Sequence, residues 1–114
     1  MKISLVREIL TAEVLSGGEL LEKEVHSACG SDMMSDVLAF VKDQSVLLTG
    51  LINPQVVRTA EMMDMKCIVF VRGKKPDASV IEIASARGMV VLSTPLRMYS
   101  ACGLLYEAGL KGVD

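Results

Sequence analysis

Three short apolar runs recur at equal intervals along the chain, and this spacing constrains the fold more than any other feature. The runs begin at Ser45, Cys67 and Met89, 22 residues apart, and read SVLLTG, CIVFVRG and MVVLSTP. Each run is followed by a segment with helical periodicity. A strand, a loop and a helix of about three turns fit this interval, so the spacing predicts repeated parallel β-α units.

Capping residues predict where the helices of these units begin and end. Asn53-Pro54 and Asp77 predict the amino ends of two helices, and Pro95 predicts the amino end of a third. Gly88 and Gly109 predict the carboxyl ends of the second and third helices, because a left-handed residue is favoured at that position.

The first third of the chain carries weaker signals. Ser4 predicts the cap of a helix that ends at Leu10, and two short strands are predicted at residues 12–15 and 25–29 with a turn at Gly17-Gly18 between them. The sequence therefore predicts an α/β fold, in which a parallel sheet of repeated β-α units has flanking helices and a short N-terminal helix plus strand pair. We expect residues 1–114 to form one domain.

A further helix is predicted before the first run, with Ser31 or Ser35 as its cap. Its apolar residues share one stripe of 3.6-residue period, which we expect to pack on the sheet: Met33, Met34, Val37, Leu38 and Val41. The chain has eight methionines, which are typical either of core packing or of an adaptable contact surface. Their helical spacing favours the core.

Composition narrows the classes of partner. The net charge of −2 and the absence of tryptophan give neither attraction for a phosphate backbone nor a stacking platform, so we expect no nucleic acid partner. The chain is 51% hydrophobic, which is high for a small domain and predicts a self-association face and a homodimer. Tyr99 and Tyr106 on the last helix are expected to lie on that face.

The cysteines and the amino terminus indicate a cytoplasmic protein. Cys29, Cys67 and Cys102 are odd in number and form no C-x-x-C pair, as expected of reduced thiols. His26 is the only histidine, so we expect no metal site and no cofactor. The segment MKISLVREIL is too charged for a signal peptide, and no apolar run is long enough to cross a membrane.

A binding site is expected in the loops that leave the three predicted strands, because parallel sheets bind ligands at the carboxyl ends of their strands. Hydroxyls, basic side chains and helix amino termini in these loops favour a phosphate or carboxylate. The candidate ligand-binding residues are Thr49, Gly50, Asn53, Arg72, Gly73, Lys74, Ser93 and Thr94. One alternative stays open. In that alternative the glycines only form tight strand exits, and the basic residues only form a solvated turn.

Catalytic signatures are missing from the sequence. It contains neither G-x-x-x-x-G-K-[ST] nor a G-x-G-x-x-G after the first strand of a βαβ unit. Asp32 and Asp36 are interpreted as solvated first-turn charges. An enzyme that uses Ser93, Thr94 or Asp36 remains an alternative, but none of these residues has a base partner in the sequence. We therefore do not expect an enzyme.

The chain resembles a stand-alone DRTGG domain from Ile3 to Leu110. The resemblance rests on the order of the predicted elements and on the segments SDMMSDVLAF, SVLLTG, CIVFVRGKKPD and VVLSTPLRMYSACGLLYEAGL. Residues Val71 to Lys74 stand where many relatives have a Thr-Gly-Gly loop.

The resemblance implies an accessory role. Such domains occur beside CBS pairs in regulated pyrophosphatases and before phosphotransacetylase catalytic domains, and a similar fold forms the amino-terminal part of HPr kinase/phosphorylase. Short single-domain members occur in anaerobes near iron-hydrogenase components, which implies a redox-enzyme partner.

Taken together, the residues and the resemblance predict a non-catalytic regulatory or assembly module that acts as a homodimer and senses a small anionic metabolite of nucleotide or phosphate type. The alternative is a pure protein-interaction module without a ligand, accessory to a hydrogenase or another redox enzyme.

Overall fold

Strands and helices alternate along the residues that this computed structural model describes, 1–40 and 45–112. The elements, in chain order, are α1 (Ile3–Leu10), β1 (Glu13–Ser16), the 3-10 helix η1 (Gly18–Leu20), β2 (Ser27–Gly30), α2 (Met34–Phe40), β3 (Ser45–Thr49), α3 (Pro54–Met62), β4 (Cys67–Phe70), α4 (Ala78–Ala86), β5 (Val90–Ser93) and α5 (Met98–Glu107). The three apolar runs become β3, β4 and β5, which confirms the predicted β-α repeat.

The strands form one sheet in the order β1-β5-β4-β3-β2. Strands β2 to β5 are parallel, and Val46, Cys67 and Val90 lie side by side across the middle of the sheet. Strand β1 pairs antiparallel with β5. The two predicted N-terminal strands therefore lie at opposite edges of the sheet, with three strands between them.

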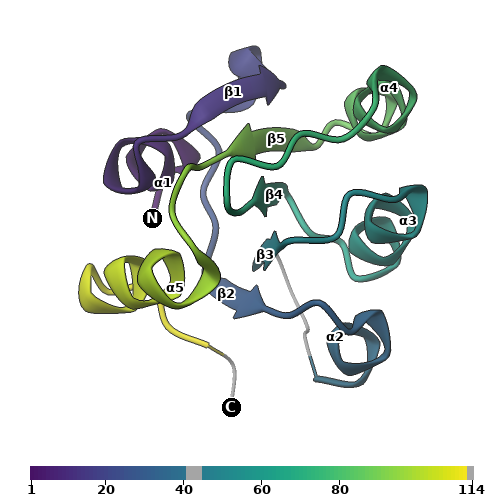
Figure 1. The fold of residues 1–114 in the computed structure, drawn as a ribbon. Helices are drawn as coiled ribbons and strands as arrows, with labels where there is room; N and C mark the ends of the chain where they lie inside the picture. Colours follow the sequence, from purple (N-terminus) through teal and green to yellow (C-terminus); the bar gives the residue numbers. More distant parts are fainter. Residues whose placement is uncertain (41–44, 113–114) are drawn as a thin grey trace.

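Helices cover both faces of the sheet (Figure 1). Helices α2, α3 and α4 cover one face, and α1 and α5 cover the other. Each step from β2 to β5 leads to the next strand in the same direction, so the three connecting helices lie on one side because crossovers keep one hand. Among the described residues, no helix is long and apolar enough to cross a membrane.

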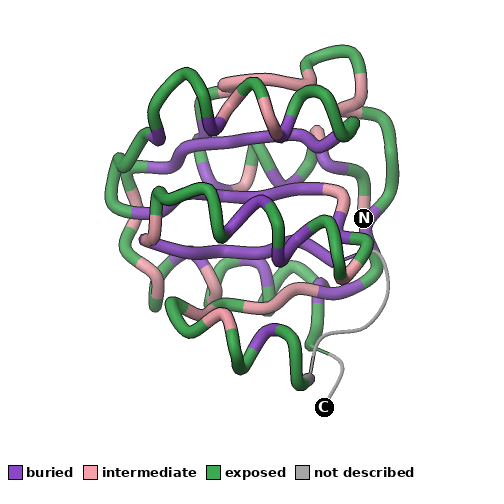
Figure 2. The backbone as a smooth tube through the Cα atoms, turned by 90° about the vertical axis from the view of Figure 1, so that its right-hand side faces the viewer, coloured by how far each residue is buried: buried purple, intermediate pink, exposed green. Residues whose placement is uncertain are grey.

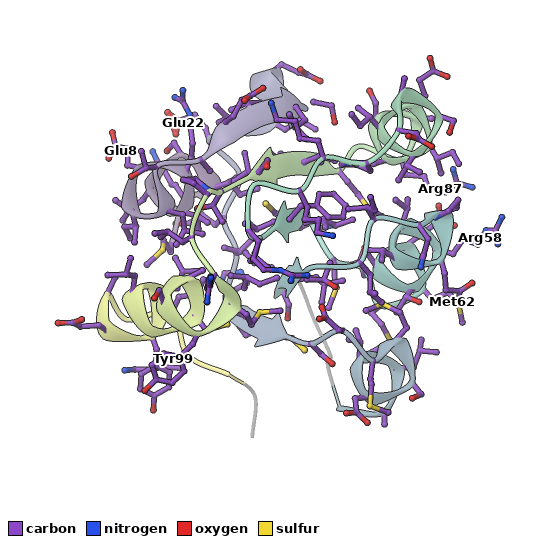
Figure 3. The ribbon with its side chains drawn as sticks, in the orientation of Figure 1. Glu8, Glu22, Arg58, Met62, Arg87 and Tyr99 are labelled. Carbon is purple, nitrogen blue, oxygen red and sulfur yellow. The ribbon has the colours of Figure 1, made fainter. Side chains whose placement is uncertain are left out.

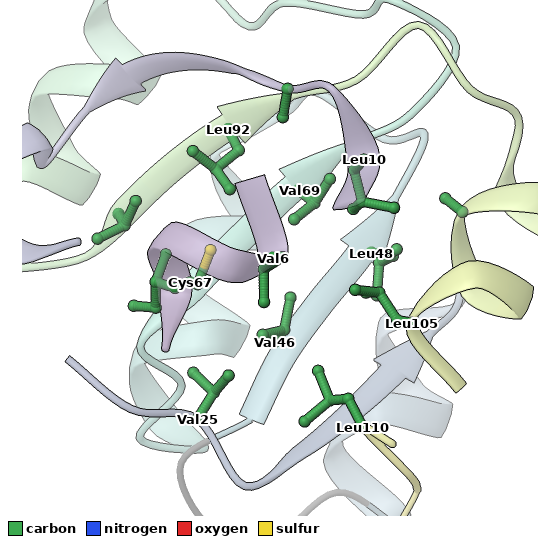
Figure 4. Packing of buried hydrophobic residues seen from close by; sticks show 14 of the residues in the cluster. Val6, Leu10, Val25, Val46, Leu48, Cys67, Val69, Leu92, Leu105 and Leu110 are labelled. Atoms are coloured by element: carbon green, nitrogen blue, oxygen red, sulfur yellow. The ribbon is translucent and has the colours of Figure 1, made fainter. Parts of the chain in front are cut away.

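A separate apolar cluster fills each side of the sheet. Alternate residues of one strand enter different clusters: Val46 and Leu48 face α1 and α5, whereas Leu47 faces α2 and α3. Figure 4 shows how Val46, Val69 and Leu92 pack on the first side. The three central strands are buried along their whole length (Figure 2), and this two-sided burial explains their unbroken apolar sequence.

Most predicted helix boundaries are confirmed. Asn53 is the N-cap of α3 with Pro54 as the first helical residue, and Asp77 is the N-cap of α4. Gly88 and Gly109 follow α4 and α5 with positive φ values of 69° and 108°, as the predicted helix ends require.

Four boundary predictions need correction. The N-cap of α1 is Lys2, and Ser4 lies inside the helix. The N-terminal strands begin one and two residues later than predicted, at Glu13 and Ser27. Helix α5 begins at Met98, three residues after Pro95, because Leu96 is held outside the helix: its carbonyl accepts from the Arg72 N–H and its own N–H donates to Thr94 Oγ1.

The predicted stripe of α2 packs only in part. Val37 is fully buried, but Met33 and Leu38 are 59% and 40% exposed, and Val41 lies outside the described residues. Neither predicted cap of α2 is its N-cap, because the helix begins at Met34. The hydroxyl of Ser31 accepts a hydrogen bond from the backbone N–H of Met33 just before the helix, and Ser35 lies within it.

Candidate functional site

Strand β4 leaves the sheet through a turn in which two consecutive residues adopt the left-handed conformation. Arg72 and Gly73 have φ values of 60° and 68°, and the backbone N–H of Lys74 donates to the carbonyl of Val71 over 3.2 Å. These are the features of a type I′ turn. Glycine adopts this conformation freely, but for Arg72 it costs about 1–2 kcal/mol.

Backbone hydrogen bonds tie this turn to the exit of β5. The N–H groups of Arg72 and Gly73 donate to the carbonyls of Leu96 and Thr94, over 2.8 and 2.7 Å. These two N–H groups are therefore not available to an anion. The contacts fix the backbone of Arg72, and its side chain is exposed.

The hydroxyls of the three candidate loops also have partners within the chain. Thr94 Oγ1 donates to the carbonyl of Leu10 over 2.7 Å, and Ser93 Oγ donates to the carbonyl of Lys74 over 2.8 Å. Thr49 Oγ1 donates to Asp32 Oδ1 over 3.0 Å. Thr49 and Thr94 are fully buried, so these two hydroxyls hold the loops together beneath the surface.

Asp32 and Arg72 lie on either side of Gly50. Asp32 Oδ1 accepts a second hydrogen bond, from the backbone N–H of Gly50 over 2.7 Å. A Cβ atom added at Gly50 would lie 3.0 Å from Arg72 Nη2 and 3.6 Å from each carboxylate oxygen of Asp32. Within the described part of the chain, neither charged group forms an ion pair within 4.0 Å. A side chain at position 50 would crowd the guanidinium, so the glycine allows Arg72 and Asp32 to approach this strand exit closely without forming an ion pair with each other.

The structure brings some of the predicted site residues together and leaves others apart. Hydrogen bonds join Gly73 to Thr94 and Ser93 to Lys74. The Arg72 guanidinium lies near Gly50, 3.0 Å from where a Cβ would stand. Asn53 lies three residues beyond Gly50 as the exposed N-cap of α3, and its side chain makes no capping hydrogen bond.

Asp32 is the residue that sequence reasoning missed. It lies two residues after β2, outside α2, and binds the exit of β3 rather than standing in the first helical turn. A signal for this position existed: Asp32 lies three residues after a predicted strand, in the same kind of strand exit as Gly50. The sequence did not show that the two strands are neighbours.

The thiols do not have the properties of nucleophiles. Burial raises the pKa of Cys67 and of Cys102, and burial also raises the pKa of Cys29, with smaller contributions from Cys102 and Asp36. All three are free cysteines. The described residues contain no group of three or more histidine, cysteine, aspartate or glutamate side chains that could hold a metal ion.

A second surface feature lies along α5. An apolar cavity of about 200 Å³ opens between α5 and strands β2 and β3, and a wider groove of about 570 Å³ runs along the outer side of the helix. Cys102 and Tyr106 line both. Tyr106 is 59% exposed beneath the Lys111 ammonium, and Tyr99 is 92% exposed and points away from the molecule (Figure 3).

The comparisons with known proteins give one family match by sequence and one similar fold. A sequence model of the DRTGG domain matches residues 5–108. No curated protein matches the chain significantly. Among solved structures, the chain is similar to the crystal structure of the CBS and DRTGG domains of the regulatory region of Clostridium perfringens pyrophosphatase, complexed with the activator diadenosine tetraphosphate.

That similarity concerns the fold. The TM-score is 0.73 at 16% sequence identity, and the match covers 91% of this chain but 45% of the pyrophosphatase chain. The present chain therefore spans less than half the length of the structure it matches.

Proposed function

Because this chain belongs to the DRTGG domain family, we propose that it is a regulatory module that binds a small anionic metabolite at the carboxyl edge of its sheet. In this proposal the module is non-catalytic, acts as a homodimer and resides in the cytoplasm. The observation that carries the ligand proposal is the placement of Arg72: an exposed guanidinium without an ion-pair partner among the described residues, beside a glycine at the adjacent strand exit.

The conformation of Arg72 supports a role beyond turn formation. A left-handed arginine is unfavourable, and a second glycine would form the same turn without that cost. Two backbone hydrogen bonds and the turn bond offset the cost and hold the strand exit in place. Strained residues that the surrounding structure over-determines are frequent at ligand sites.

The related pyrophosphatase region supports the class of ligand. Its structure contains an adenine dinucleotide that activates the enzyme, in a fragment that comprises CBS and DRTGG domains. A nucleotide or another phosphorylated metabolite is therefore the first class to test for the present chain.

A non-catalytic role agrees with the hydroxyls at this edge. Ser93 and Thr94 donate to backbone carbonyls, which are not bases, and Thr49, which does have a carboxylate partner, is fully buried. Nucleophilic catalysis needs an accessible hydroxyl with an adjacent base.

Calorimetric titration of the purified protein with ATP, ADP, AMP, acetyl phosphate, pyrophosphate and coenzyme A tests the proposal. We expect saturable binding of at least one compound and a loss of about tenfold or more in affinity in Arg72→Ala, because hydrogen bonds to charged groups contribute about 1.5–3 kcal/mol. Arg58→Ala is the matched control: Arg58 is exposed on α3, and its replacement should leave binding unchanged. Binding that is insensitive to Arg72→Ala would reject the site.

The groove along α5 favours a second candidate function. Exposed tyrosines beside an apolar cavity are typical of protein contacts, so the same module could act by binding a redox enzyme or another protein without any ligand. If none of the compounds binds, and Tyr106→Glu abolishes capture of a protein partner, this alternative replaces the ligand proposal.

A further inference from the structure

We infer that two copies of this chain associate by exchanging a side chain: the Tyr99 ring of each copy enters the apolar cavity between α5 and strands β2 and β3 of the other copy. This inference rests on the homodimer of the proposed function and names the contact that holds it together. It starts from one surface on which an exposed aromatic ring and an apolar cavity lie along the same helix and do not fill each other.

The Tyr99 ring packs against almost nothing in its own protomer. Tyr99 lies in the first turn of α5, is 92% exposed and points away from the molecule (Figure 3). A tyrosine ring carries a large apolar area, and tyrosine is enriched at protein interfaces. The whole ring is therefore available to a second molecule.

The cavity has the size and the lining that an aromatic ring needs. Its volume is about 200 Å³. An apolar cavity of about 150 Å³ is large enough to bind benzene. The small residues Ala28 and Gly30 line the cavity from β2, and Cys102 and Leu105 line it from α5. A tyrosine ring thus matches the cavity in both size and polarity.

A two-fold axis brings each ring to the cavity of the other copy. Tyr99 and Tyr106 lie equally far from a point between Cys102 and Gly103, at about 5 Å along the helix axis. In an antiparallel pair of α5 helices centred on that point, Tyr99 of one copy lies opposite Tyr106 of the other. Tyr106 lines the cavity. A parallel pair would instead place the two Tyr99 rings against each other and away from both cavities.

The charges on this surface suit a second copy of the same chain. The groove beside the cavity contains one acidic and one basic residue, Glu107 and Lys111, whose formal charges cancel. Two copies of such a surface do not repel each other, whereas a strongly charged partner would find no net opposite charge. Neither side chain forms an ion pair within 4.0 Å among the described residues. Both can therefore hydrogen-bond the Tyr99 hydroxyl of the other copy, which needs a polar partner once its ring is buried.

The first test measures the dissociation constant of the dimer by analytical ultracentrifugation over a dilution series. We expect Tyr99→Ala to raise this constant about 100-fold, because each dimer loses two buried rings and the loss of one such ring costs about tenfold. Tyr99→Phe should keep most of the affinity, since the ring fills the cavity. Met62→Ala is the matched control: Met62 is 71% exposed on α3, on the opposite side of the sheet, and its truncation should leave the constant unchanged.

A second variant blocks the cavity from within the chain. Ala28→Phe places a ring in the cavity of its own protomer and should weaken the dimer as much as Tyr99→Ala does, while thermal unfolding checks that the fold is retained. An equal mixture of the two variants should form a heterodimer about tenfold tighter than either homodimer, because one ring then meets one open cavity. Native mass spectrometry distinguishes the heterodimer by its mass.

The outcomes separate this inference from the proposed function. A wild type that stays monomeric throughout the dilution series would overturn both the exchange of rings and the proposed homodimer. A wild-type dimer whose dissociation constant is unchanged in Tyr99→Ala would overturn the exchange alone and leave the homodimer standing. A mixture that associates no more tightly than its two components would do the same.

Discussion

Gly30, at the end of β2, is required by its neighbour on α5. A Cβ atom at this position would lie 2.6 Å from Cys102 Sγ, closer than folded proteins tolerate. We expect Gly30→Ala to lower the free energy of unfolding by about 1–3 kcal/mol, because overpacking forces side chains or backbone to move. Urea denaturation measures the change.

Gly103 provides the matched control for this substitution. A Cβ at Gly103 would meet nothing within 4 Å, and the residue lies inside α5, so Gly103→Ala should raise the free energy of unfolding by about 0.5–1 kcal/mol. Adding Cys102→Ala to Gly30→Ala should recover part of the loss, since the clashing sulfur is removed. A neutral Gly30→Ala would contradict the packing of α5 on β2.

The buried thiols predict how stability depends on pH. Burial raises the pKa of Cys67 in the folded state, so the folded protein keeps this proton at pH values where the unfolded chain loses it. The free energy of unfolding is therefore insensitive to this thiol below the unfolded pKa of about 8.5 and falls above it, by up to about 1.4 kcal/mol per pH unit.

Denaturation between pH 8 and 10 measures this decline, and Cys67→Ala is the comparison. The variant is less stable at every pH because it loses buried volume, but its stability should decrease less steeply with pH. Identical slopes for the wild type and the variant would show that Cys67 does not contribute to the decline.

At the scale of helices and strands, the buried hydroxyl of Thr94 links the end of α1 to the segment that precedes α5. It donates to the carbonyl of Leu10 at the end of α1 and accepts the N–H of Leu96 before α5. We expect Thr94→Val to lower the free energy of unfolding by about 1–3 kcal/mol, because the buried carbonyl of Leu10 and the partly buried N–H of Leu96 lose their partner, while Thr94→Ser retains stability. Chemical denaturation of both variants separates the contribution of the hydrogen bonds from that of packing. A similar loss of stability in the serine variant, which keeps the hydroxyl, would assign the effect to the lost methyl group.

The same contacts show what the sequence can and cannot predict. The central strands were predictable because burial on both faces requires continuous apolar runs. The start of α5 was not, because residues 94–96 are held by Leu10 and Arg72, which lie far away in the sequence. The sequence also did not predict that the exits of β2 and β3 are neighbours. The local sequence of a parallel strand does not show which strand it pairs with, so the contact between Asp32 and Gly50 could not be predicted.

For the whole molecule, the exposed tyrosines of α5 predict the association face. Light scattering at micromolar concentration should report the mass of a dimer, and Tyr106→Glu should convert it to a monomer, because the charge would be buried in an apolar interface. Met62→Glu is the control: Met62 is 71% exposed on α3, on the opposite side of the sheet, and its replacement should leave the dimer intact. A monomeric wild type would reject the proposed homodimer.

The position of β1 at the sheet edge next to β5 also affects how the protein is made. Residues 13–16 pair with residues 91–93, so the first strand has no partner until most of the chain has been synthesised. During synthesis on the ribosome, β1 therefore has no strand partner while the parallel units that follow it form. Such long-range pairing slows folding and exposes an unpaired strand to other chains. The growing chain is thus most prone to aggregation just before β5 emerges.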